Sequence, residues 1–119
     1  MGLFSKLVAS SNKSRIEESF RTNYISMVGH SPSYAAIDGI GACAEIIGAS
    51  KGTEADAAQL DKTIDEFAQA VGCDEQTMIM SLRLLFMLCA TTDGAAEPGF
   101  EWAYAVVDAK VSRYCPSMK

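Results

Sequence analysis

The chain has 119 residues, and its 15 acidic and 10 basic side chains give a formal net charge of −5. This length fits one domain, and the apolar content of 49% excludes a disordered chain, which could not bury enough surface to offset its ordering entropy. The acidic balance argues against a nucleic-acid-binding protein, which needs a basic face. No apolar run reaches the ~18 residues of a membrane-spanning helix, so we expect no stable membrane insertion.

The first half of the chain predicts a short N-terminal segment and two helices. Residues 1–12 form a short amphipathic segment with apolar positions Leu3, Phe4, Leu7 and Val8. From Arg15 to about Val28, apolar residues recur every three or four positions, which predicts an amphipathic helix. Ser31-Pro32-Ser33 is a helix start signal, and it predicts a further helix over residues 33–50.

The helix predicted over residues 33–50 is rich in small residues and contains the pattern G-x-G-x-x-A from Gly39 to Ala44. A dinucleotide site would need a strand before this pattern, but the preceding residues are typical of a capped helix start. Each interior glycine costs up to ~1 kcal/mol against alanine, so we interpret the glycines as points of close helix packing. They could serve packing within one chain or across a homodimer.

The second half predicts three more helices. Thr53 caps one that ends at Gly72, Asp74 caps a strongly apolar one that runs to Ala90, and Pro98 opens the last. The apolar helix is expected to be the most buried. Residues 115–119 form a tail after Pro116 closes the last helix. The sequence therefore predicts an all-α, compact single-domain bundle of about five helices over residues 1–119.

The four cysteines are expected to be free thiols in a reducing cytoplasm. Their spacing contains no C-x-x-C pair, and no apolar signal core precedes the first predicted helices. The predicted location is therefore cytoplasmic.

The charge is unevenly distributed along the chain. Residues 1–51 hold five basic and four acidic side chains, whereas residues 52–119 hold five basic and eleven acidic ones. This asymmetry predicts an acidic surface for a basic protein partner, or a cation site, in the second half. Our candidate partner-binding residues are Glu54, Asp56, Asp61, Asp65 and Glu101.

No residue pattern indicates an enzyme. His30 stands alone, no G-x-S-x-G is present, and the calcium loop D-x-[DN]-x-[DN]-G is absent. Asp61 and Asp65 share a helix face by their i, i+4 spacing, but nothing in the sequence indicates a cleft around them. We therefore predict a non-enzymatic protein with no assigned cofactor.

Two stretches repeat one pattern, in which an apolar helix ends in alanine, polar residues and glycine. The first ends in Ala49-Ser50-Lys51-Gly52 and the second in Ala90-Thr91-Thr92-Asp93-Gly94. With the start Gly2-Leu3-Phe4-Ser5-Lys6-Leu7, this pattern resembles the TerB-like (tellurite-resistance) helical family, in which such turns read Ala-x-Asp-Gly and acidic residues follow.

The resemblance, over about residues 36–112, implies two related helical hairpins and a stress-response accessory role. It also implies a weak divalent-cation site at Asp93 and Glu97. Lys51 stands where the family has aspartate, which opposes cation binding at the first turn. The leading hypothesis is a small helical interaction module with an acidic C-terminal half. The alternative is an acidic inhibitor, of the toxin-immunity or phage-encoded kind, that covers a basic partner protein.

Overall fold

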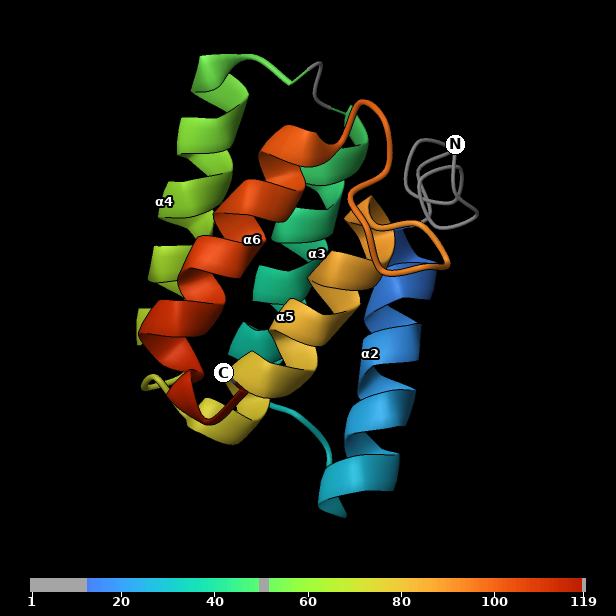
Figure 1. Cartoon of the computed structure of the whole chain (residues 1–119). Coiled ribbons are helices and arrows are strands. Elements are labelled where there is room, and N and C mark those ends of the chain that lie inside the picture. The colour runs from blue at the N-terminus through green and yellow to red at the C-terminus, as the bar shows by residue number, and fades with distance from the viewer. Residues whose placement is uncertain (1–12, 50–51, 119) are drawn as a thin grey trace.

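The computed structural model of the chain describes residues 13–49 and 52–118 (Figure 1). Within these ranges the chain forms no strand. The elements are α2 (Lys13–Val28), α3 (Tyr34–Ala49), α4 (Glu54–Ala70), α5 (Glu75–Cys89), α6 (Glu101–Tyr114) and the 3-10 helix η1 (Pro116–Met118). The predicted all-α bundle is confirmed. The predicted amphipathic segment at residues 1–12 and Lys51 lie outside the described residues.

Four helices form two antiparallel hairpins, α3 with α4 and α5 with α6 (Figure 1). The hairpins pack side by side, so that α3 lies against α5 and α4 lies against α6. Helix α2 flanks this group, packs mainly against α3 and touches α5 over a shorter stretch. The acidic helix α4 and the flanking helix α2 therefore lie at opposite edges of the bundle (Figure 1).

Side-chain caps define the starts of α4 and α5 as the sequence predicts. The Thr53 hydroxyl accepts from the Asp56 amide, and the Asp56 carboxylate accepts from the Thr53 amide, which completes a capping box. Asp74 caps α5 by accepting from the Thr77 amide at 3.0 Å. Between the two helices, Gly72 has a φ of 67°, the left-handed conformation that glycine adopts at little cost.

The core lies where the two hairpins meet, and α2 covers one side of it. Its largest fully buried side chains include Phe20 of α2, Ile40 of α3, Leu60 of α4 and Leu85 of α5. Gly39 confirms the packing interpretation of the glycine-rich helix, because a Cβ there would lie 2.3 Å from Cδ1 of the buried Phe67 ring. That glycine lets α3 and α4 approach closely.

Two sequence-based boundaries need correction. The last helix begins at Glu101, not at Pro98, because Gly99 has a φ of 91° that no right-handed helix contains. The tail after the last helix is folded, since Cys115 is fully buried and η1 packs against α6. The burial expectation is confirmed, because α5 contains eight buried residues, more than any other described helix; Met87 is its half-exposed apolar residue.

Candidate functional site

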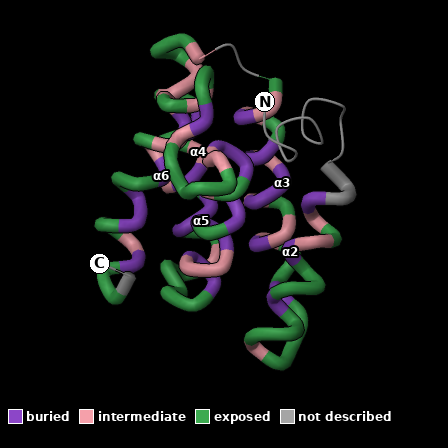
Figure 2. The backbone as a smooth tube through the Cα atoms, turned by 45° about the vertical axis from the view of Figure 1, so that its right-hand side comes forward, coloured by how far each residue is buried: buried purple, intermediate pink, exposed green. Residues whose placement is uncertain are grey.

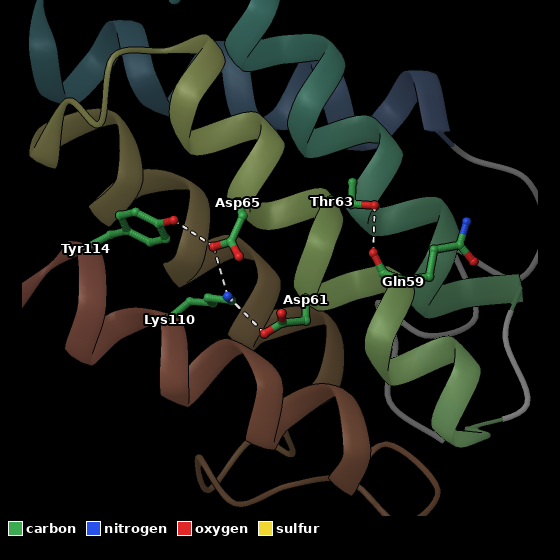
Figure 3. A network of polar contacts seen from close by, with 6 residues as sticks. All are labelled: Gln59, Asp61, Thr63, Asp65, Lys110 and Tyr114. Atoms are coloured by element: carbon green, nitrogen blue, oxygen red, sulfur yellow. Dashed lines mark hydrogen bonds and ion pairs between the residues drawn. The ribbon is translucent and has the colours of Figure 1, made fainter.

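A polar network joins the acidic helix α4 to α6 (Figure 3). The Lys110 ammonium lies 2.9 Å from an Asp61 oxygen and 2.8 Å from Oδ1 of Asp65, to which it donates a hydrogen bond. The Tyr114 hydroxyl donates to the same Asp65 oxygen at 2.6 Å. Because Lys110 is followed by Tyr114 four positions later, and Asp61 by Asp65, two matching i, i+4 pairs meet across the helices.

Burial and pairing act in opposite directions on the groups of this network. Burial alone would raise the pKa of Asp65, but the hydrogen bonds from Lys110 and Tyr114 outweigh it and hold that pKa below its usual value. Burial would likewise lower the pKa of Lys110, yet its bonds to Asp61 and Asp65 raise it. Lys110 is 4% exposed and remains charged at neutral pH.

Most of the predicted partner-binding residues make polar contacts within the chain. Asp61 and Asp65 share one ammonium, and Asp61 keeps a half-exposed side chain. Asp56 is engaged in the capping box, and Glu101 accepts a hydrogen bond from the Gly99 amide at 2.6 Å. Glu54 is exposed in the first turn of α4.

Three of these candidates lie together. Glu54, Asp61 and Asp65 are seven and four positions apart on α4, so helix geometry places them on one face of that helix. Glu101 lies on α6 and Asp56 near the α3–α4 turn. We call Glu54, Asp61, Asp65 and the exposed Glu66 the acidic edge. In total α4 carries five acidic and one basic side chain.

The loop between α5 and α6 holds the two residues predicted to bind a cation. Asp93 is exposed in the turn that the Gly94 amide closes by donating to the Thr91 carbonyl, whereas Glu97 is 5% exposed. Among residues 13–49 and 52–118, no group of three or more His, Cys, Asp and Glu side chains is arranged to hold a metal ion. Cation binding at Asp93 and Glu97 therefore stays a prediction.

The sequence did not indicate the second candidate site, an apolar groove of about 210 Å³ between α2 and α5. Helix α2 contributes Phe20, Asn23 and Met27 to its lining. Helix α5 contributes Met80, Arg83, Leu84 and Met87. We call this set the methionine groove. Met27 and Met87 are large apolar side chains, yet each stays at least half-exposed, which the sequence pattern alone does not reveal.

Helix α2 contacts α5 over a shorter stretch than it contacts α3. Figure 2 shows that most of the C-terminal half of α2 is exposed. Tyr24, which is 5% exposed, is its buried residue. The Tyr24 hydroxyl lies 3.2 Å from Oγ1 of the buried Thr77, and its ring meets His30 edge-on at 5.7 Å. This contact joins the C-terminal half of α2 to the first turn of α5.

All four cysteines are free, as predicted. Three of them are buried, and burial raises the pKa of Cys43 and of Cys89 to about 12 and that of Cys115 to about 11. Cys73 is exposed in the α4–α5 turn. Such buried thiols are structural and do not act as nucleophiles at neutral pH.

Two further findings concern the described part of the chain and its likeness to known proteins. None of the helices in residues 13–49 and 52–118 combines the length and apolar character needed to cross a membrane. Comparison with protein-family models, with curated proteins and with solved structures finds no match to this chain. The resemblance to the TerB-like family therefore stays a prediction from the residues named above.

Proposed function

We propose that this protein is a non-enzymatic binding module that presents the acidic edge of α4 to a basic protein partner. The observation that supports this proposal is the concentration of charge on one helix at the rim of the bundle. Helix α4 holds five of the acidic side chains against one lysine, and its large apolar residues, Leu60, Ile64 and Phe67, are all buried. Electrostatic attraction is thus the main force that this surface offers a partner.

The Lys110 network supports the same proposal. It holds Asp61 and Asp65 in fixed positions, so these carboxylates lose little side-chain freedom when a partner binds. Since one ammonium serves two carboxylates, the cluster retains a net negative charge. A guanidinium or ammonium group of a partner could pair with the exposed oxygens of Asp61.

A charge-neutralising variant of the acidic edge tests the proposal. We expect Glu54→Gln/Asp61→Asn to weaken binding of a basic partner captured from native cells by about tenfold, and raised salt to weaken the wild type similarly. The matched control, Glu18→Gln/Asp38→Asn, removes the same charge from exposed sites on α2 and α3. Equal loss with both variants, or binding that ignores salt, would argue against the acidic edge.

The inhibitor hypothesis involves the same surface and also requires that binding block the activity of the partner. If the captured partner is an enzyme, an immunity-type antagonist must abolish its activity at one-to-one stoichiometry, and an accessory protein need not. An activity assay of the partner with increasing amounts of this chain separates the two roles.

Calorimetric titration with calcium, magnesium and zinc tests the cation site at Asp93 and Glu97 and with it the TerB-like hypothesis; absence of heat counts against both.

A further inference from the structure

We propose that the methionine groove is a second binding site, which takes an amphipathic partner helix that carries an acidic residue beside its apolar face. The inference concerns the edge of the bundle opposite α4 and does not depend on the proposed function of the acidic edge. Helix-in-groove recognition needs an apolar surface between two helices that takes the side chains from one face of a partner helix, and the lining contributed by α2 and α5 is mainly apolar.

The dimensions of the groove suit a helix better than a small ligand. Its lining on α2 runs from Phe20 to Met27, and its lining on α5 from Met80 to Met87. The two ends of each run are seven positions apart, or about two helical turns, which is about 10 Å. Side chains at positions i, i+4 and i+7 of a partner helix cover the same length. The volume of about 210 Å³ lies below that of common small-molecule pockets.

Methionine makes the groove adaptable. Met27 and Met87 are 66% and 50% exposed, and both have unbranched thioether side chains that can repack around different apolar groups. The floor of the groove is rigid by contrast, since Phe20 is 1% exposed and packs on the Tyr24 ring at 5.8 Å. A rigid floor with flexible walls is the arrangement that methionine-rich helix-binding surfaces use.

Arg83 sets the charge of the partner. It is the only charged residue that lines the groove, it is exposed, and no ion pair joins it to any residue in 13–49 or 52–118. Apart from Arg83 the two helices add no net charge, because α2 holds three basic and two acidic side chains and the only other charged residue of α5 is Glu75, in its first turn. A carboxylate at the edge of the partner helix would therefore pair with Arg83.

Two other occupants fit this charge less well. Residues 1–12 of the chain itself contain apolar residues but only one charged side chain, Lys6, and no carboxylate for Arg83. A second copy that presented its own groove would bring two Arg83 side chains together. A second copy that presented α4 would supply carboxylates but no large apolar side chain, because those of α4 are buried. A separate acidic amphipathic helix satisfies both requirements.

Two designed peptides of about 18 residues, five helical turns, test the proposal on the full chain. Both carry leucine at i, i+4 and i+7, and they differ only in whether glutamate or lysine flanks the leucines. We expect the glutamate peptide to bind the wild type about fivefold more tightly, and Arg83→Glu to reverse that order. Met87→Gln should weaken both peptides by about tenfold. Its matched control, Ile25→Gln, changes a residue that is 42% exposed outside the groove and should have no effect.

Methyl signals of the methionines in NMR spectra report the site directly. The signals of Met27, Met80 and Met87 should shift when the glutamate peptide is added, whereas that of the fully buried Met78 should not. Binding of neither peptide, or a preference that Arg83→Glu leaves unchanged, overturns the proposal. So does a shift of the Met27 and Met87 signals that Phe4→Gln/Leu7→Gln causes without peptide, which would assign the groove to residues 1–12. A shift on dilution would assign it to a second copy.

Discussion

Two helix–helix contacts of this bundle differ in how they are filled. One joins α4 to α6, and the other joins α2 to α5. In the first, the long side chain of Lys110 fills the seam and its charge is met by Asp61 and Asp65. In the second, Met27 and Met87 border the seam without filling it. A buried charge that is paired fixes one arrangement of two helices, whereas an open apolar border leaves room for a third.

The difference also separates what stabilises the protein from what it can offer to a partner. The groove floor and the Lys110 seam are buried, so changes there should act on stability. The groove walls are exposed, so changes there should act on binding alone. Five predictions test this division, from the largest expected effect to the smallest.

Phe20→Ala should cause the largest loss of stability. The ring is 1% exposed and joins α2 to the rest of the bundle, so its removal creates a cavity under the groove. We expect the free energy of unfolding to fall by roughly 3–5 kcal/mol, measured by urea denaturation. A loss below about 1 kcal/mol would mean that α2 contributes little to the fold.

Lys110→Ala should have an intermediate effect. It removes a buried side chain and the partner of two carboxylates, but water can still reach Asp61 and Asp65, whose side chains are 52% and 31% exposed. We expect a loss of about 2 kcal/mol in the free energy of unfolding. The exposed Lys62 on α4 provides the control, and Lys62→Ala should cost less than about 0.5 kcal/mol. Similar losses for the two lysines would show that the seam is not closed by Lys110.

Acid should weaken the Lys110 seam in a defined pH range. The pKa of Asp65 lies below its usual value of 3.8 in the folded protein, so Asp65 contributes stability above that pH and loses it as the pH falls through the folded pKa. Asp74 behaves in the same way, because hydrogen bonds from Thr77 lower its pKa. Thermal melting between pH 6 and pH 2 should show less pH dependence for Asp65→Asn than for the wild type. Parallel curves would contradict the role of Asp65.

Alkali should weaken the same seam by removing the charge of Lys110. Asp61 and Asp65 raise the pKa of Lys110 above 10.5, so its contribution is complete below that pH and is lost as the pH rises through the folded pKa.

The smallest effect is expected at the groove walls. Met27→Ala and Met87→Ala each truncate a side chain that is at least half-exposed, so each should change the free energy of unfolding by no more than about 0.5 kcal/mol. Urea denaturation of the two variants next to Phe20→Ala gives the comparison on one scale. A loss of 2 kcal/mol or more at Met87 would show that the groove is closed in solution.

Sequence reasoning predicted the parts of the fold that depend on local signals. The caps at Thr53 and Asp74 and the helical periodicity depend on neighbouring residues, and the structure confirms them. The start of α6 was misplaced because a proline at position 98 favours a helix start, while the left-handed Gly99 that delays it has no distinctive pattern.

The candidate sites depend on contacts between distant segments, and here the sequence said less. The i, i+4 spacing showed that Asp61 and Asp65 share a face, but not that Lys110, 45 positions after Asp65, would lie between them. The groove needed the relative placement of α2 and α5, whose lining residues lie more than 50 positions apart. A periodic helix reveals which of its faces is apolar, but not which neighbour leaves part of that face uncovered.

The three buried cysteines can be used to detect opening of the helical bundle. Burial raises the pKa of Cys43 and Cys89, so these thiols are protonated at pH 7, and burial also denies reagents access to them. Cys73, by contrast, is at the surface and can react at once. Modification of the buried thiols of Cys43, Cys89 and Cys115 by a thiol reagent therefore reports opening of the bundle, in native buffer and without denaturant.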